Sequence, residues 1–186
     1  LLHVNTQVYY YKMLRYCLNY AVSEELISAN PMNKIKNEEK PHKHRTEREY
    51  LTIDELRKLA QTPFYNGLLK KAFLFSCFCG LRHSDIIALT WGDIEMDDDG
   101  NSRLYIIQKK TKEAISLPLS QEAIKQLPKR EDAKEDDIIF KKLITLGRTN
   151  EILPKWAEQA GIKKHITFHT ARHTHATMLL TLGVDL

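Results

Sequence analysis

Cysteine is scarce in this sequence, and its scarcity excludes a disulfide framework. The three cysteines are an odd number, and their spacing does not match a zinc motif. Cys77 and Cys79 fall within an apolar run, so we expect buried free thiols. This usage fits a protein of the reducing cytoplasm.

Long apolar runs are also missing. No run approaches the roughly 18 residues that a membrane-spanning helix needs. The N-terminal residues lack the charged-then-apolar pattern of a secretion signal. We therefore expect a protein that neither spans a membrane nor is secreted.

What the chain does contain is an ordinary globular composition with a mild excess of positive charge. Of its 186 residues, 42% are hydrophobic and 28% are charged, which is enough to bury a core. The formal net charge of +4 suits a polyanionic partner, but many proteins with this charge never bind DNA. Charge alone therefore decides little.

The hydrophobic pattern divides the chain into a helical N-terminal part, a linker and a larger unit. Residues 6–22 carry apolar side chains at three- and four-residue steps, which predicts an amphipathic helix. Further along, residues 34–49 are charged and almost free of large apolar residues, so they cannot support a core. We place domains at 1–36 and 50–186, with a linker at 37–49.

The larger unit is expected to be mainly α-helical with a small antiparallel β-sheet, an α+β fold. Thr52 and Glu55 have capping-box spacing ahead of the first helix, and Gly80 is placed to end a buried second one. Ser84 or Asp85 is placed to cap a short helix. Further helices are expected near residues 121–127, 146–160 and 167–182, and strands at 103–108 and 114–119 with a polar loop between them.

Tyrosines are concentrated in the predicted N-terminal helix. Aromatic residues at helical spacing are more often core residues than DNA contacts, so we expect burial to be their main role. They are Tyr9, Tyr10, Tyr11, Tyr16 and Tyr20.

Two arginine-centred segments, far apart in the sequence, carry the strongest functional signal. They are GLRHSD at Gly80–Asp85 and HTARH at His169–His173. A guanidinium group matches two phosphate oxygens and stays charged at physiological pH, so a converging pair can hold a phosphodiester as charge builds on it. Residues three apart on a helix share a face, so His169 and Arg172 can point at one phosphate. This pattern predicts a protein that acts on the nucleic-acid backbone.

Simpler interpretations compete with this one. A single arginine is most often a solvated or ion-paired surface residue, and a histidine three residues from an arginine can be a structural pair. Histidines four apart can also bind one zinc ion. We reject zinc because neither an HExxH sequence nor a cysteine set completes such a site, and Arg172 would repel the cation. The histidines concerned are His165, His169, His173 and His175, of which we expect the last two to pack or to contact the main chain.

In its longer context the sequence resembles the tyrosine recombinases of the phage-integrase family. Residues 80–94, GLRHSDIIALTWGDI, are similar to the family's G-L-R-x-S-E/D block and its L-x-W-x-D-I continuation. Residues 169–173 are similar to its H-x-x-R-H block. The resemblance covers the chain from about Tyr50 onward as a catalytic domain, and residues 1–36 resemble the end of the family's helical, SAM-like core-binding domain.

The resemblance implies a role for each residue of these blocks. Arg82 and Arg172 would hold the non-bridging phosphate oxygens, and His169 would assist by hydrogen bonding or proton transfer. Lys110, before a threonine on the expected hairpin, would protonate the leaving 5′ oxygen. Asp85, one helical turn past Arg82, would orient a catalytic histidine or arginine. The implied reaction is site-specific recombination, such as DNA integration, by transesterification through a 3′-phosphotyrosyl link that needs no metal or other cofactor.

Double-stranded DNA is the partner that the resemblance implies. The two domains would clamp the duplex, and four protomers would assemble on paired sites. Basic residues outside the catalytic set are candidates for backbone contacts, which position a protein without reading the base sequence. Two of them, on the hairpin, also compete with Lys110 for the role of acid. These candidates are Lys12, Arg15, Arg45, Arg48, Lys109 and Lys112.

The nucleophilic tyrosine of the family is not where the pattern places it. It should follow an L-G-H segment a few tens of residues beyond Arg172, whereas every tyrosine lies at or before Tyr105 and the chain stops at Leu186. We therefore expect a catalytic domain that is incomplete at its C-terminus, in a chain that cannot by itself cleave DNA covalently. Two alternatives stay open: a non-cleaving DNA-binding relative or truncated regulator, and a type IB topoisomerase.

Overall fold

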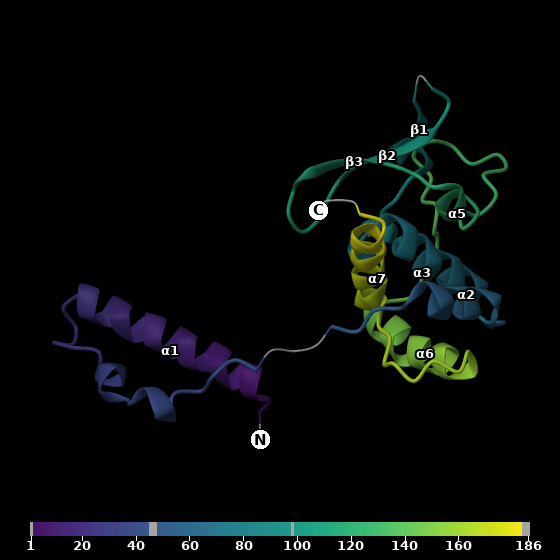
Figure 1. The fold of residues 1–186 in the computed structure, drawn as a ribbon. Coiled ribbons are helices and arrows are strands. Elements are labelled where there is room, and N and C mark those ends of the chain that lie inside the picture. Colours follow the sequence, from purple (N-terminus) through teal and green to yellow (C-terminus); the bar gives the residue numbers. More distant parts are fainter. Residues whose placement is uncertain (1, 45–47, 98, 184–186) are drawn as a thin grey trace. The chain divides into compact units, whose positions relative to one another are not determined.

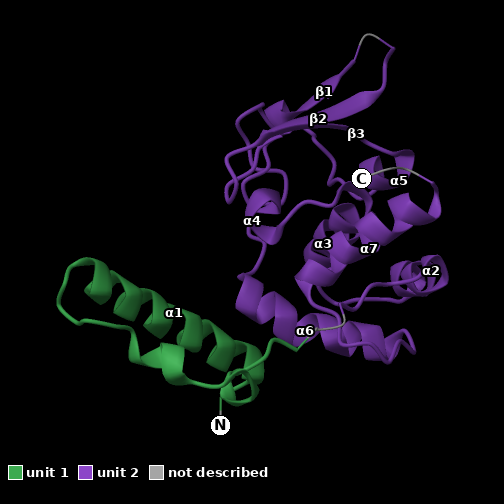
Figure 2. Cartoon of the chain, turned by 60° about the vertical axis from the view of Figure 1, so that its left-hand side comes forward, with its two compact units in different colours: residues 1–47 green, residues 48–186 purple. Residues whose placement is uncertain are grey.

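The structure, a computed structural model, describes residues 2–44, 48–97 and 99–183. The chain divides into two compact units, residues 1–47 and residues 48–186 (Figure 2). This division falls near the end of the segment that the sequence assigned to a linker. Part of that segment is a short 3-10 helix, η2 (Asn37–Glu39).

Unit 1 is built on one long helix, α1 (Val4–Ser23), followed by the short 3-10 helix η1 (Pro31–Lys34). Asn30 is buried and joins the two. Its side-chain oxygen accepts a hydrogen bond from the Met32 amide at 2.9 Å and thereby caps η1. Its amide nitrogen donates to the carbonyl oxygen of Arg15 and to Oδ1 of Asn19, both on α1. This one side chain therefore fastens the returning chain to the helix.

The prediction that the tyrosines of α1 are core residues is wrong within this unit for four of the five, whereas Tyr11 is partly buried. Tyr9, Tyr10, Tyr16 and Tyr20 expose between 56% and 77% of their surface, and Val8 is the buried residue of the helix. Helical spacing shows that side chains share a face, but it does not show what covers that face. Within unit 1, Val8 is the buried residue of α1, so most of the helix surface is left uncovered there.

Unit 2 is a helical body with a three-stranded antiparallel sheet at one end (Figure 1). Its helices are α2 (Ile53–Gln61), α3 (Gly67–Cys79), α4 (His83–Ile86), η3 (Trp91–Asp93), α5 (Gln121–Ile124), α6 (Leu146–Gln159) and α7 (Phe168–Thr181). Its strands are β1 (Ile94–Met96), β2 (Ser102–Ile107) and β3 (Ala114–Pro118), in the order β1-β2-β3. The predicted fold class, mainly α with a small antiparallel sheet, is confirmed.

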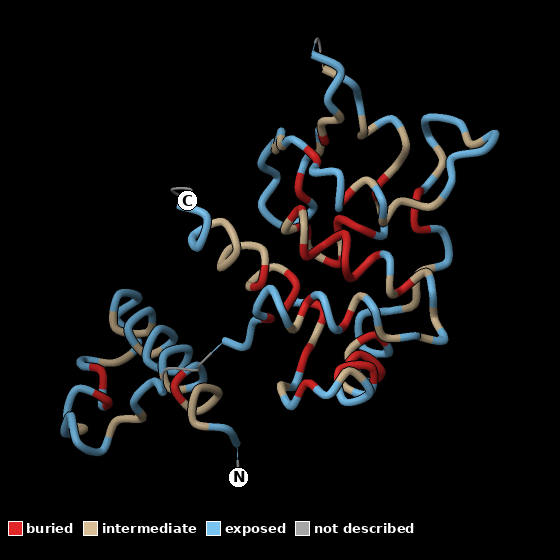
Figure 3. Tube along the Cα trace, turned by 45° about the vertical axis from the view of Figure 1, so that its right-hand side comes forward, coloured by how far each residue is buried: buried red, intermediate tan, exposed pale blue. Residues whose placement is uncertain are grey.

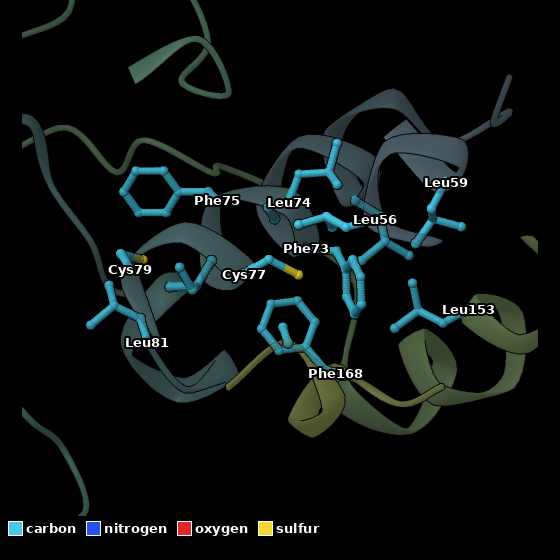
Figure 4. Packing of buried hydrophobic residues seen from close by; sticks show 14 of the residues in the cluster. Leu56, Leu59, Phe73, Leu74, Phe75, Cys77, Cys79, Leu81, Leu153 and Phe168 are labelled. Carbon is cyan, nitrogen blue, oxygen red and sulfur yellow. The ribbon is translucent and has the colours of Figure 1, made fainter. Parts of the chain in front are cut away.

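Helix α3 lies at the centre of this body, and buried stretches concentrate around it (Figure 3). The Phe73 ring meets Trp156 of α6 and Phe168 of α7 edge to face, each at 6.0 Å between ring centroids. Figure 4 shows Phe73 and Phe168 among the leucines that fill the space between these helices. Burial of each large side chain contributes roughly 1.5–3 kcal/mol. This packing holds the end of α3, which precedes Arg82, against α7, which carries His169 and Arg172.

The predicted buried thiols of α3 are confirmed. Cys77 and Cys79 are buried and free. Removal from water disfavours a thiolate, and it raises the pKa of Cys79 to about 12. Burial raises the pKa of Cys77 as well, which favours the protonated thiol at both positions.

Local signals fixed most helix boundaries. The capping box of Thr52 and Glu55 is present at the start of α2. Gly80 ends α3 in the left-handed region with φ of 68°. The predicted cap of α4 is wrong, because Arg82 is its N-cap residue and Asp85 is its third residue. An acidic side chain at that third position can bond back to the N-cap amide, so the same spacing fits either placement.

Candidate active site

Two loops and a helix end converge on one open pocket of unit 2. Arg82 comes from the turn between α3 and α4, Lys110 from the loop between β2 and β3, and His169 and Arg172 from the first turns of α7. The remaining lining residues are His83, Ser84, Ile87, Thr145, Leu146 and Phe168. The structure thus brings together all four residues predicted to be catalytic.

Arg172 is held by the end of helix α3. Its guanidinium donates a hydrogen bond to the main-chain carbonyl of Gly80. Burial, and then the charge of Arg82, lower the pKa of Arg172, while Asp85 opposes this shift. Because a free guanidinium loses its proton only above about pH 12, Arg172 keeps its positive charge at neutral pH despite the lowered pKa.

Arg82 is held by a residue that sequence analysis missed. Its guanidinium donates to Oε1 of Gln108 at 2.5 Å, and the hydroxyl of Thr111 donates to the same oxygen at 2.8 Å. Gln108 is 5% exposed and directly follows strand β2. A polar residue at the start of a loop is common, so the sequence offered no signal that this side chain reaches Arg82.

Asp85 bonds to two main-chain amides. One carboxylate oxygen accepts from the amide of Lys109 at 3.1 Å, and the other accepts from the amide of Arg82 at 3.4 Å. The sequence predicted that it would orient a catalytic histidine or arginine. Its bonds to these amides connect the main chain at Arg82 to the main chain of the loop that carries Lys110, and its charge also acts on Arg172.

The hairpin loop presents its three lysines differently. Lys110 lines the pocket, whereas Lys109 and Lys112 do not. Lys112 adopts a positive φ of 62°, and its amide donates to the carbonyl of Gln108 at 2.9 Å. The side chains of all three lysines are exposed. Of the competing candidates for the acid, Lys110 is the one beside the arginines and His169.

His169 lies in a field of positive charge. Burial, followed by the charges of Arg172, Arg48, Arg82 and Lys110, lowers the pKa of its imidazole. The shift favours a neutral ring at neutral pH, which can accept a proton or a hydrogen bond. The ring contacts that of His173 edge to face, with 4.6 Å between centroids.

The remaining basic candidates are distributed over both units. Lys12 and Arg15 are exposed on α1 of unit 1. Arg48 is exposed at the start of unit 2, where its charge lowers the pKa of both His169 and His173. Arg45 lies outside the described residues.

Two further histidines, His83 and His175, pack against neighbouring residues of unit 2. His83 is buried, with Nε2 at 3.1 Å from the carbonyl oxygen of Ile144 and its ring against Phe168. His175 packs against Gly80. Among the residues that the structure describes, no group of three or more histidine, cysteine, aspartate or glutamate residues could hold a metal ion.

Comparison with known proteins identifies the family. The family model described as the Phage integrase family matches residues 49–186, so the chain belongs to that family. The tyrosine recombinase XerD of Listeria innocua is 31% identical over 196 residues, covering 95% of this chain and 63% of the relative. The tyrosine recombinase XerC of Chlamydia pneumoniae is 26% identical over 180 residues, covering 90% and 56%. The chain thus spans little more than half the length of these relatives.

A solved structure has the same fold at lower identity. A lambda integrase tetramer bound to a Holliday junction superimposes with a TM-score of 0.71 at 22% identity, covering 94% of this chain and 52% of the integrase chain.

In the described part of this chain, no helix is both long and apolar enough to cross a membrane.

Proposed function

We propose that the protein containing this chain is a site-specific DNA recombinase that cleaves and rejoins DNA strands by transesterification. The observation that carries this proposal is the convergence of Arg82, Lys110, His169 and Arg172 on one open pocket. Two guanidinium groups, a lysine and a neutral histidine match the charge that develops on a phosphodiester under attack. The recombinase names of the relatives support the same reaction.

Each group has a defined task in the proposed reaction. A tyrosine hydroxyl attacks the phosphorus atom while Arg82 and Arg172 hold the two non-bridging oxygens. His169 accepts a hydrogen bond or a proton during the attack. The bond from phosphorus to the 5′ oxygen breaks, and Lys110 gives that oxygen its proton. The 3′-phosphotyrosyl bond keeps the energy for rejoining, when a 5′ hydroxyl attacks in the reverse direction.

Substrate and assembly follow from the same comparison. We propose double-stranded DNA as the substrate and a tetramer on paired sites as the active form, as the lambda integrase tetramer on a Holliday junction suggests. The exposed Lys12, Arg15, Arg48, Lys109 and Lys112 would contact the DNA backbone. None of the described residues that line the pocket is a tyrosine, and we propose that the nucleophile comes from a segment outside this sequence. We place the protein in the cytoplasm, with its DNA.

A nicked DNA substrate tests the proposal in a protein that carries this chain together with its following segment. Loss of the short strand beyond the cleavage site prevents rejoining and traps the covalent adduct. Arg82→Ala and Arg172→Ala should each slow adduct formation by at least about 100-fold while DNA affinity changes little. Arg57→Ala is the control, because Arg57 is exposed on α2 and paired with Asp54.

The outcomes separate the alternatives. A wild-type protein that binds its site but never forms an adduct would support the DNA-binding regulator instead. Normal cleavage by both arginine variants would disprove the assignment of the phosphate clamp. Relaxation of supercoiled DNA without exchange between sites would favour a topoisomerase.

A further inference from the structure

The side chain of Gln108 contacts both Arg82 and the loop that carries Lys110. Its side chain is 5% exposed, although it carries a polar amide. A buried polar side chain is costly unless its groups are bonded. Its single oxygen accepts from the guanidinium of Arg82 and from the hydroxyl of Thr111. The residue therefore joins an arginine of the phosphate clamp to the loop that carries the lysine.

The main chain of Gln108 also closes this loop. Its amide donates to the carbonyl of Glu113, and its carbonyl accepts from the amide of Lys112, both at 2.9 Å. Lys109 is held at its amide by Asp85, and Thr111 is held at its hydroxyl by Gln108. The residues on both sides of Lys110 are therefore held in place, Lys109 by Asp85 and Thr111 by Gln108. Lys110 itself is exposed.

We propose that Gln108 is a positioning residue that fixes the Lys110 loop against Arg82 before DNA binds. This inference rests on the proposed function, because it assigns Lys110 the role of acid. The two donors bound to one oxygen set the distance between the phosphate clamp and the loop. A displacement of about 1 Å at a catalytic group can cost about 100-fold in rate, so loss of this connection should slow cleavage.

The chemistry of the side chain suits this task better than its alternatives. A carboxylate at the same position would accept both hydrogen bonds, but its negative charge would pair with Arg82 and compete with the phosphate. An apolar side chain would leave the guanidinium and the hydroxyl without an acceptor. A neutral amide binds both donors and leaves the charge of Arg82 available.

The test uses two DNA substrates that differ in one atom. In the first the leaving atom is the natural 5′ oxygen, and in the second it is sulfur, in a 5′-bridging phosphorothiolate. A thiolate leaves readily without an acid because thiols ionise near pH 8.5, far below alcohols. Cleavage rates in single turnovers are measured for wild type, Gln108→Leu and Thr111→Val, in the protein that includes the following segment. Gln126→Leu, at a half-exposed position in the same unit, is the control.

Gln108→Leu should slow cleavage of ordinary DNA by roughly 10- to 100-fold, and Thr111→Val should slow it less. On phosphorothiolate DNA both variants should cleave within about threefold of wild type, because the misplaced acid is no longer needed. Rescue by sulfur separates positioning of the acid from a general loss of folding, which would affect both substrates.

Two results would overturn the inference. One is cleavage of ordinary DNA by Gln108→Leu at the wild-type rate, and the other is an equal deficit on both substrates, which would place the effect at Arg82 alone. If urea unfolding shows that Gln108→Leu does not fold, Thr111→Val decides by the same comparison. A wild-type protein that forms no adduct with either substrate would instead contradict the proposed function.

Discussion

The guanidinium of Arg172 donates a hydrogen bond to the main-chain carbonyl of Gly80, a residue 92 positions earlier in the chain. That carbonyl belongs to the C-cap of α3, where the helix dipole favours a cation. The same glycine lies against the ring of His175, which is on α7 with Arg172. One glycine therefore sets both the end of the buried helix and the orientation of an arginine in the pocket.

Replacement of Gly80 by alanine should destabilise unit 2. The residue has φ of 68°, and an added Cβ would lie 2.6 Å from Cδ2 of His175. The left-handed conformation alone costs a non-glycine residue about 1–3 kcal/mol, and the contact adds to this cost. We expect Gly80→Ala to lower the free energy of unfolding by at least about 2 kcal/mol in urea titrations.

Gly147→Ala is the control for this substitution. Gly147 lies in the first turn of α6 with open space where a Cβ would be, so alanine should leave stability unchanged or raise it slightly. Equal unfolding curves for the two variants would show that the conformation at Gly80 is not required.

Thr174 fastens the start of unit 2 to α7. Its hydroxyl accepts a hydrogen bond from the amide of Leu51 at 2.9 Å, and both residues are buried. Thr174→Val keeps the shape but leaves this amide without an acceptor, which should lower the free energy of unfolding by about 1–3 kcal/mol. Thr181→Val is the matched control, because Thr181 is exposed on the same helix and should change stability by less than about 0.5 kcal/mol.

Anchoring at Thr174 also bears on the pocket. Leu51 follows Arg48 by three residues, and the charge of Arg48 acts on His169 and His173. Hydrogen exchange of the Leu51 amide gives a direct readout. Protection should be lost in Thr174→Val and kept in Thr181→Val, and unchanged protection in both would contradict the assigned bond.

Stability should decrease as the pH falls below neutrality, with His83 as one cause. Burial lowers the pKa of this imidazole below its ordinary value, so the folded state holds the ring neutral. Below about pH 6.5 this imidazole binds a proton in the unfolded chain but stays neutral in the folded chain. The free energy of unfolding therefore decreases. The drop continues until the pH reaches the lowered pKa of the folded state.

Unfolding measured at several pH values between about 7.5 and 5.5 tests this dependence, since one proton contributes at most about 1.4 kcal/mol per pH unit. His83→Gln removes the titrating group and should reduce the slope. The slope should not vanish, because the pKa values of His169, His173 and His175 are lowered as well. His165→Gln, at an exposed position, is the control. A slope that His83→Gln leaves unchanged would assign the dependence to the other histidines.

The sequence correctly predicted features that depend on a few consecutive residues, but it did not predict which face of α1 is exposed. The capping box at Thr52 and the left-handed end at Gly80 depend on a few consecutive residues, and both are confirmed. The burial of the α1 tyrosines depends on what packs opposite them, and that prediction is wrong within unit 1 for all but Tyr11. The cap of α4 was misplaced by the ambiguity between a cap residue and an acidic residue inside the first turn.

The amino-acid sequence by itself determined which chemical groups the pocket contains, because Arg82, Lys110, His169 and Arg172 lie in short segments with recognisable local patterns. Only the tertiary structure decided what holds them. The main-chain carbonyl of Gly80 accepts a hydrogen bond from Arg172, and the side-chain oxygen of Gln108 accepts one from Arg82. Both contacts join residues that are far apart in the chain. Main-chain carbonyls and common glutamines carry no local pattern. The packing of α3 against α7 brings the Gly80 carbonyl to Arg172, and the placement of the β2–β3 loop beside the α3–α4 turn brings Gln108 to Arg82.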